Sequence, residues 1–279
     1  MIVSRITGIL CINLLLTINL AAQTTISGGN VSGTWLKSGS PYKVNGNITV
    51  PNGQTLTIEP GVRVEFAQFR SMKVDGRIVA IGGAKSTDSI WFTRQYLHDT
   101  SSWKGVKFIN TANTNDTSTF KYCVFSYGKS IYDTAYNYRS CGISIKNYGK
   151  VKILNSSFYK NEASLGASIH ILSGSYVYIR SCTFKYNKAS TFNYAQGASV
   201  YSAGNYGSAI KMEPTSKLFA DSCLFYKNIR GKDYSNGSVV LDASAIHITA
   251  GSTFISNAVI NNTTFDGNEG YTVQTYGKA

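Results

Sequence analysis

Acidic side chains are scarce in this sequence. Only 14 of the 279 residues are Asp or Glu, and they are dispersed along the chain. A calcium site needs several carboxylate or carbonyl oxygens close together, and most glycoside hydrolases need a pair of carboxyl groups across the scissile bond. Neither arrangement is expected here, and we predict a protein that holds no metal ion and no cofactor.

Cysteine is scarce as well, with five residues in the chain. No two of them have the Cys-x-x-Cys spacing of a zinc site. In an exported protein Cys123, Cys141, Cys182 and Cys223 suggest disulfides. The repeat described below, however, places Cys123 and Cys182 two coils apart, which is beyond disulfide reach. We therefore expect four buried free thiols that act as small apolar side chains.

Charged residues make up only 15% of the chain, yet 27 Lys and Arg against 14 Asp and Glu give a formal net charge of +13. The lysines are scattered singly and no nucleic-acid-binding motif is present, so we predict no nucleic-acid partner. A basic exported protein is better suited to anionic glycans. The alternative is that the positive charge serves solubility alone.

Long apolar runs are absent apart from one at the N-terminus. Arg5 supplies a positive start, Ile6 to Leu20 the apolar stretch, and Leu20-Ala21-Ala22 a small-residue cleavage site. This order is typical of a secretory signal peptide, whereas a membrane span is usually longer. We predict that residues 1–22 are a signal peptide and that the mature chain is secreted or at the cell surface, with no transmembrane segment.

Glycine and tyrosine are plentiful, with 26 and 19 residues, and the chain repeats itself. Phe158 and Phe184 stand 26 residues apart, as do Ile143 and Ile169. Five segments share an ending, four of them as Phe-x-x-Asn: Phe125 with Gly128, Phe158 with Asn161, Phe184 with Asn187, Phe225 with Asn228, and Phe265 with Asn268. A Gly/Ala/Ser-Ile element recurs between these segments at Ile143, Ile169, Ile210 and Ile246.

Each period holds three short stretches of alternating apolar and polar residues, which indicates strands. One unit cannot bury its own apolar face, but units stacked about 4.8 Å apart bury a shared core. The repeat therefore predicts an all-β fold, a parallel β-helix with three strands per coil. Alternation points each Phe inward beside a column of small residues, and each Asn falls at a turn, where it serves the scaffold.

The regular coils occupy residues 111–279. Residues 23–110 contain similar stretches with less regular spacing, the last at Lys104 to Phe108, and we predict that they form the N-terminal cap and the first coils. After Asn268 the chain begins another strand and then stops at Ala279 without a polar cap. We expect the regular part to continue in a longer protein.

Several of these motifs resemble those of a known family. The segment Pro41 to Gly61, followed by Val74-x-Gly76 and Trp103-x-Gly105-x-x-Phe108, resembles the N-terminal coils of secreted bacterial β-helix repeat proteins. The Phe-x-x-Asn and Gly/Ala/Ser-Ile elements resemble the repeats of polymorphic outer-membrane proteins. The resemblance implies a right-handed, single-stranded parallel β-helix in an exported bacterial protein. It says much about fold and little about activity.

Three long insertions leave the same corner of the coil, between Gly128 and Gly142, Asn187 and Ala209, and Asn228 and Ala245. Insertions at one corner lie on one side of the stack, where they commonly build a binding face. They are rich in tyrosine: Tyr132, Tyr136, Tyr138, Tyr194, Tyr201, Tyr206 and Tyr234. A tyrosine ring suits a sugar or a protein partner. Alternatively, these rings only pack the loops onto the coils.

The outward face of the strand that follows these loops carries the other candidates. Successive coils present Ser144, His170, Lys211 and His247 there, with Glu213 two residues beyond Lys211. In polysaccharide lyases of similar fold, the substrate groove lies at a position that resembles this strand face. A lyase needs a base and a positive charge beside the uronate carboxylate, which His170 and Lys211 could supply. An ordinary solvated strand face would look the same, so these residues are weak catalytic candidates.

Three hypotheses for function follow. The first is a non-catalytic protein at the cell surface or outside the cell, whose Tyr-rich loops and Lys211 bind an acidic or neutral polysaccharide or a surface protein. The second is a lyase-like enzyme that acts on acidic glycans. The third is a purely structural stalk.

Overall fold

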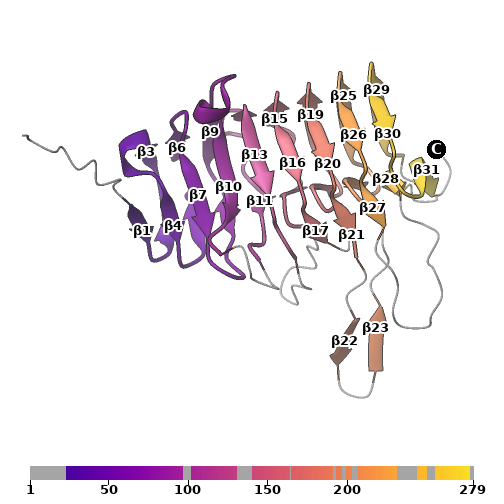
Figure 1. Ribbon diagram of the computed structural model, residues 1–279, viewed down its shortest axis with the longest axis horizontal. Coiled ribbons are helices and arrows are strands. Elements are labelled where there is room, and N and C mark those ends of the chain that lie inside the picture. The colour runs from indigo at the N-terminus through magenta and orange to yellow at the C-terminus, as the bar shows by residue number, and fades with distance from the viewer. Residues whose placement is uncertain are drawn as a thin grey trace, which may run out of the picture.

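Figure 1 presents a computed structural model of the chain, and the account below covers the residues that it describes. They are residues 23–96, 102–130, 140–163, 165–190, 193–196, 199–202, 207–230, 244–249 and 255–276. The predicted signal peptide lies outside these residues. Within them, the chain runs almost entirely as short strands, joined by turns and two short 3-10 segments, Lys37–Gly39 and Ser86–Asp88.

The strands form three long parallel sheets. Sheet A contains β1 (Thr24–Ile26), β4 (Tyr42–Val44), β7 (Arg63–Phe66), β10 (Ile90–Arg94), β13 (Cys123–Ser126), β16 (Ser157–Tyr159), β20 (Thr183–Lys185), β26 (Leu224–Tyr226) and β30 (Thr264–Asp266). Sheet B contains β2 (Gly29–Asn30), β5 (Ile48–Val50), β8 (Met72–Val74), β11 (Val106–Ile109), β14 (Ile143–Lys146), β18 (Ile169–Ile171), β24 (Ile210–Met212), β28 (Ser244–Thr249) and β31 (Tyr271–Tyr276). Sheet C contains β3 (Gly33–Trp35), β6 (Thr55–Ile58), β9 (Arg77–Ile81), β12 (Ser118–Lys121), β15 (Val151–Leu154), β19 (Tyr176–Arg180), β25 (Lys217–Asp221) and β29 (Asn257–Asn261).

Each coil takes one strand from sheet A, then one from sheet B, then one from sheet C. Because every strand pairs in parallel with the equivalent strand of the next coil, the chain winds into a right-handed parallel β-helix, as predicted. Figure 1 shows the coils side by side along the long axis. The same three sheets run through residues 23–110 and 111–279 without a break.

The predicted strand positions are close to those observed, with one correction. The stretch Lys104 to Phe108 was expected to be extended throughout, but β11 begins at Val106. Gly105 has a φ of +85°, a left-handed conformation that cannot continue a strand. A side chain at this position would also come within 2.6 Å of the carbonyl oxygen of Gly142 on the next coil.

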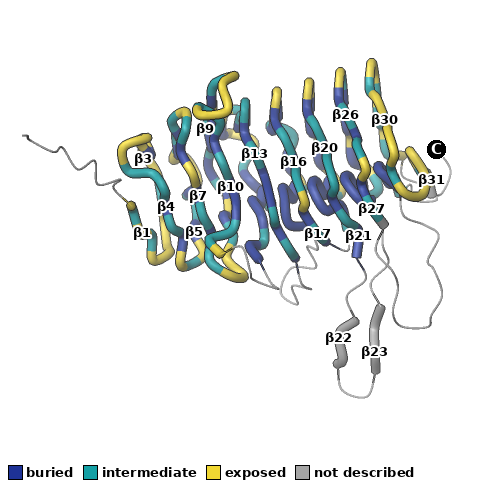
Figure 2. The backbone as a smooth tube through the Cα atoms, viewed as in Figure 1, coloured by how far each residue is buried: buried dark blue, intermediate teal, exposed yellow. Residues whose placement is uncertain are grey.

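A column of phenylalanine rings fills the interior, as alternation predicted. Phe92, Phe125, Phe158, Phe184, Phe225 and Phe265 stack in order, with ring centroids 4.6 to 4.9 Å apart. Of these, all but Phe265 are fully buried. Figure 2 shows buried stretches in dark blue along the middle coils, whereas the last coil is intermediate or exposed. The core is therefore continuous along the axis, and each coil rests on its two neighbours.

Asparagine side chains form a second column at the corner between sheets A and B. The Nδ2 atom of Asn187 donates to the Oδ1 atom of Asn228 at 2.9 Å and to the carbonyl oxygen of Phe158 at 3.0 Å. Its own Oδ1 atom accepts from the backbone and side-chain nitrogens of Asn161, both at 3.1 Å. The predicted scaffold role of these residues is confirmed, because they satisfy buried backbone groups where the strands end.

Gly128 stands where this asparagine column would otherwise extend. Its backbone nitrogen donates to the Oδ1 atom of Asn161 at 2.9 Å, so the asparagine column ends at this coil. A Cβ atom here would lie 2.6 Å from the carbonyl oxygen of Cys141. The approach of that carbonyl explains why this coil has glycine instead of asparagine.

The four cysteines of the described chain are buried free thiols. Parallel pairing in sheet A brings Cys123, Ser156, Cys182, Cys223 and Thr263 into one column. This is the column of small residues that alternation predicted beside the phenylalanines. Within the described ranges, no helix is both long and apolar enough to cross a bilayer.

The three predicted insertions leave the corner between sheets A and B. Three two-residue strands pair there as a small additional sheet, β17 (Glu162–Ala163), β21 (Lys188–Ala189) and β27 (Ile229–Arg230). Beyond β21, the antiparallel hairpin of β22 (Asn193–Gln196) and β23 (Ser199–Ser202) hangs below the coils in Figure 1. The predicted one-sided placement of the insertions is thus confirmed by where their ends lie.

Candidate functional site

The outward residues of sheet B form the single row that the sequence predicted. Ser144 pairs with His170, His170 with Lys211, and Lys211 with His247 on successive parallel strands. Because the register is exact at each step, the four Cα atoms follow one line with a spacing of about 4.8 Å. The row continues with Lys107 on β11 at one end.

This row is buried, although its residues point away from the core. His170 and His247 are each 1% exposed, and Lys211 is 3% exposed. The alternative of an ordinary solvated strand face therefore does not hold for these three residues. The role that we predicted for them requires contact with a ligand, and their burial in this structure argues against direct access.

A histidine–glutamate contact lies beside the centre of the row. The Nε2 atom of His170 is 3.1 Å from the Oε1 atom of Glu213, which sits one residue beyond the end of β24. Burial alone would raise the pKa of Glu213, but the hydrogen bond from His170 and the nearby charges of His170 and Lys211 outweigh it, and the net pKa is lowered. Glu213 is then a carboxylate, which can only accept, so the Nε2–H group of His170 donates a hydrogen bond to its Oε1 atom.

Lys211 is a buried base in this row. Burial lowers its pKa to about 8, and the negative charge of Glu213 opposes part of that shift. The ammonium group also donates to the Oγ1 atom of Thr249 on the next coil. A lysine with this pKa exchanges protons near neutral pH, which is a property of many functional sites and also of buried structural lysines.

The Tyr-rich loops lie mostly outside the residues that the structure describes. This holds for Tyr132, Tyr136, Tyr138, Tyr206 and Tyr234. Tyr194 and Tyr201 are paired opposite each other across the hairpin of β22 and β23. A sugar-binding or protein-binding role for these seven residues stays a prediction.

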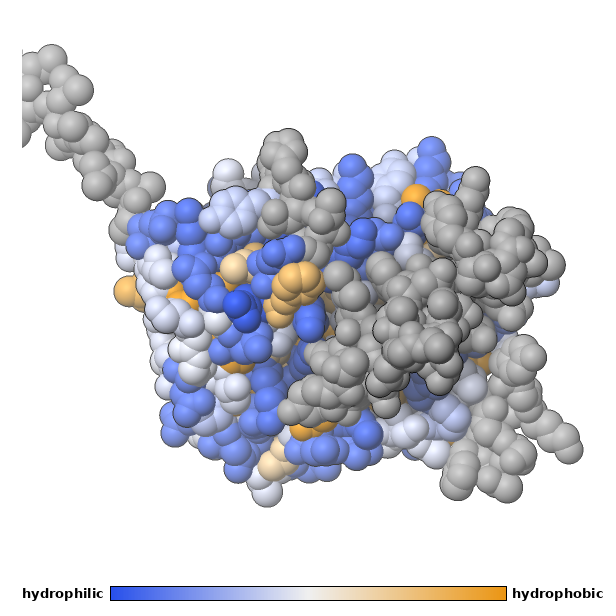
Figure 3. All heavy atoms as spheres, turned by 90° about the horizontal axis from the view of Figure 1, so that it is seen from below, coloured by the Kyte–Doolittle hydropathy of each residue, from blue (hydrophilic) through white to orange (hydrophobic). Residues whose placement is uncertain are grey.

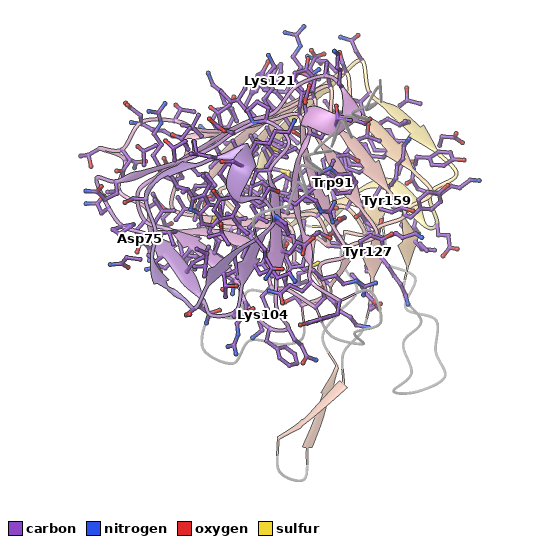
Figure 4. All side chains as sticks on the ribbon, turned by 60° about the vertical axis from the view of Figure 1, so that its left-hand side comes forward. Asp75, Trp91, Lys104, Lys121, Tyr127 and Tyr159 are labelled. Atoms are coloured by element: carbon purple, nitrogen blue, oxygen red, sulfur yellow. The ribbon has the colours of Figure 1, made fainter. Side chains whose placement is uncertain are left out.

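A different group of tyrosines lines the corner from which these loops depart. Tyr127, Tyr159, Tyr186 and Tyr226 come from four successive coils and are half-buried. Their rings meet edge to face, with centroids 5.6, 6.0 and 5.6 Å apart in that order. We call these four residues the tyrosine ladder. Figure 4 shows its first two members close together on one side of the helix.

Cations accompany the tyrosine ladder along its length. Arg94 stacks on Tyr127 at 4.8 Å from guanidinium carbon to ring centroid. The ammonium nitrogen of Lys160 lies 5.2 Å from the ring centroid of Tyr159, and that of Lys227 lies 5.0 Å from Tyr226. Hydrogen bonds to these tyrosine oxygens raise the pKa of both lysines. The ladder therefore presents aromatic rings together with a row of permanent positive charge.

Sequence reasoning missed this ladder, although its signal is present in the repeat. The two variable positions of Phe-x-x-Asn hold one tyrosine and one lysine in three consecutive coils, as Tyr159-Lys160, Lys185-Tyr186 and Tyr226-Lys227. The first of each pair points outward, and the second has a positive φ at the turn. Figure 3 looks onto this side of the molecule, where the described surface is predominantly hydrophilic with small scattered apolar patches.

The described residues include no group of three or more His, Cys, Asp or Glu side chains placed to hold a metal ion. The surfaces described above offer tyrosine rings, cationic side chains and the pair of His170 with the half-buried Glu213.

Comparisons with known proteins add a partial similarity. A segment of 64 residues, 22% of this chain, is 38% identical to part of the protein bark beetle of Drosophila melanogaster, of which it covers 2%. No protein-family model matches the chain. No solved structure matches it.

Proposed function

We propose that this chain is an exported, non-catalytic β-helix that binds a polysaccharide along the corner between sheets A and B. The observation that carries the proposal is the tyrosine ladder with its lysines. The N-terminal signal pattern supports export, since it has the positive, apolar and small-residue parts in order.

The ladder has the composition of a sugar-binding surface. Tyrosine combines a flat apolar ring with a polar edge, so it can stack on a sugar and donate a hydrogen bond. The accompanying lysines can pair with carboxylate or sulfate groups on the polymer. Because one tyrosine is supplied by each of four successive coils, an extended chain of repeating units could make the same weak contact several times, and such contacts add through effective concentration.

The position of the ladder links it to the predicted loops. Tyr127 directly precedes Gly128, Tyr186 directly precedes Asn187, and Tyr226 stands two residues before Asn228, where the three long insertions begin. The ladder and the loop tyrosines would therefore belong to one binding face. On repeat proteins a rigid scaffold commonly positions the variable loops that form the binding face.

The lyase alternative has less support. It requires His170 or Lys211 to reach a substrate, and both side chains are at most 3% exposed. His170 is also engaged by Glu213 at 3.1 Å. A proton-transferring base must come within hydrogen-bond reach of the substrate.

The test is affinity electrophoresis of the mature chain through gels that contain a soluble polysaccharide, with neutral mannan and polygalacturonate as the first two. We expect wild-type protein to be retarded by at least one polymer and the double variant Tyr159→Ala/Tyr186→Ala to lose most of that retardation. Tyr122→Ala is the matched control, because Tyr122 is half-buried like the ladder tyrosines but lies at the turn between β12 of sheet C and β13 of sheet A.

The two polymers also separate two modes of binding. Retardation by polygalacturonate that weakens with salt indicates charge pairing, while retardation by mannan that resists salt indicates stacking. If the double variant keeps the wild-type retardation while retaining its circular dichroism spectrum, the ladder is not the binding surface. If no polysaccharide in a wider panel retards the wild type, the proposal fails and a protein partner or a stalk takes its place.

A further inference from the structure

A cleft on the outer face of sheet C stands apart from the surfaces described so far. It has a volume of about 780 Å³ and lies across β12, β15 and β19 on three successive coils. Parallel pairing places Lys121, Leu154 and Arg180 in one outward column, with Lys152 and Tyr178 in the column beside it. The cleft is therefore built by the regular coils themselves.

The charge of this cleft has one sign. Three cations line it, Lys121, Lys152 and Arg180, and none of the lining residues that the structure describes is Asp or Glu. Neither lysine forms an ion pair with a described carboxylate. The Nε atom of Arg180 pairs with Asp221 at 3.1 Å, yet the Arg180 side chain remains 59% exposed. Two lysines without a described carboxylate partner, beside an exposed arginine, favour an anion that would offset their positive charge.

Apolar surface accompanies these cations. Leu154 lies between Lys121 and Arg180 in its column, and so forms an apolar floor between two charges about two coil spacings apart. The ring of Tyr178 is held by stacking on Phe219, with centroids 5.1 Å apart and planes 2° from parallel. Tyr176 lines the cleft with 39% of its surface exposed. A ligand with an anionic group and a flat, partly apolar body matches this arrangement.

We propose that this cleft is a second binding site, for one acidic unit of a glycan. The carboxylate or sulfate of the unit pairs with the three cations, and its ring lies over Leu154 against Tyr178. The site is separate from the ladder, since its residues come from sheet C, and Figure 4 shows Lys121 at the upper edge of the molecule, apart from Tyr127 and Tyr159. The inference extends the proposed function to a short acidic saccharide, but it rests on its own residues.

The experiment is isothermal titration calorimetry of the mature chain at low ionic strength. The probes are a galacturonate trisaccharide, a sulfated disaccharide and the neutral galactose trisaccharide. We expect at least one acidic probe to bind and the neutral probe not to bind, and we expect added salt to weaken the acidic complex. Which acidic probe binds tells carboxylate recognition from sulfate recognition.

Lys152→Glu should weaken the acidic complex by about tenfold or more, as expected when a hydrogen bond to a charged group is lost. Lys152 is exposed, so the substitution should leave folding intact. Lys43→Glu is the matched control, since it makes the same charge change on the outward face of β4 in sheet A. Tyr178→Ala should weaken the complex as well, without changing its salt dependence.

Three results would overturn this site: no binding of either acidic probe, equal losses in Lys152→Glu and Lys43→Glu, or equal affinity for the neutral and acidic trisaccharides. The ladder variant Tyr159→Ala/Tyr186→Ala separates the two proposals. It should bind the acidic probe as the wild type does. If calorimetry shows no binding at the cleft, but polysaccharide gels still retard the wild type and not the ladder variant, the proposed function stands without the cleft. If calorimetry shows binding and the gels do not retard the wild type, only the cleft remains.

Discussion

Substituting Asn187 by alanine should destabilise the β-helix strongly, and the structure allows the size of the effect to be worked out. The Asn187 side chain is fully buried and makes four hydrogen bonds, two as donor and two as acceptor. A net contribution of about 1 kcal/mol per bond, with a further cost for buried groups left without partners, predicts a loss of about 3 to 6 kcal/mol in the free energy of unfolding.

The measurement is equilibrium urea denaturation followed by circular dichroism, with Asn113→Ala as the control. Asn113 is exposed in the loop before β12, so its loss should change stability by under about 0.5 kcal/mol. A solenoid is stabilised mainly by contacts between neighbouring coils, so the transition of Asn187→Ala should also broaden as the coils after β20 unfold separately. A loss below about 1 kcal/mol would refute the view that the asparagine column stabilises this corner.

Asn187→Asp tests the direction of the bonds. An ionised aspartate can accept from Asn161, but it would face two acceptors, the carbonyl oxygen of Phe158 and the Oδ1 atom of Asn228. The folded state should therefore raise the pKa of this carboxyl above its unfolded value of about 3.9. Because protonation then favours the folded form, the variant should gain stability relative to wild type as pH falls. A pH-independent difference between the two proteins would contradict this hydrogen-bond assignment.

Three further predictions follow from burial. Phe184→Ala should lower the free energy of unfolding in urea by about 3 to 5 kcal/mol, because the ring is fully buried between two others. Tyr96→Ala should lower it by under about 1 kcal/mol, because Tyr96 is 61% exposed. Equal losses would mean that the core column is misassigned. Burial lowers the pKa of Lys211 to about 8, so Lys211→Met should be more stable than wild type at neutral pH. The difference in stability between Lys211→Met and wild type should shrink as pH rises from about 8 to about 10.4, where the unfolded lysine also loses its proton. A difference in denaturation midpoint that stays constant over this range would contradict the prediction. Burial also raises the pKa of the Cys123 and Cys141 thiols, so a thiol reagent should react slowly with native protein and find four thiols after unfolding without reductant; two or fewer would indicate a disulfide.

Much of the fold could be predicted because a repeat expresses the same physics several times. One inward phenylalanine is weak information, but five at equivalent positions define a column, and the spacing from Phe158 to Phe184 gives the length of a coil. The pairing of His170 with Lys211 and His247 followed from the same register. Side-chain direction in a strand alternates strictly, so the row was predictable residue by residue.

The environment of that row could not be predicted in the same way. Alternation tells which way a side chain points and nothing about what lies against it. Glu213 is one residue beyond the end of β24, and its contact with His170 depends on the path of the turn. The low exposure of Lys211 does not follow from alternation either. A period in the sequence encodes the direction of a side chain and not the contacts made at a turn.

The asparagine column explains how one corner can carry binding residues and insertions without loss of stability. At this corner Asn161, Asn187 and Asn228 satisfy the backbone groups at the ends of the sheet A strands by bonding only to equivalent positions on neighbouring coils and to Phe carbonyls. These backbone hydrogen bonds are thus complete before each loop begins, so the length of the loop does not affect the packing of the core. The two residues between each Phe and Asn lie within this regular part of the coil, ahead of the short paired strands β17, β21 and β27. In three consecutive coils tyrosine and lysine occupy those positions, where the chain combines fixed geometry with access to solvent.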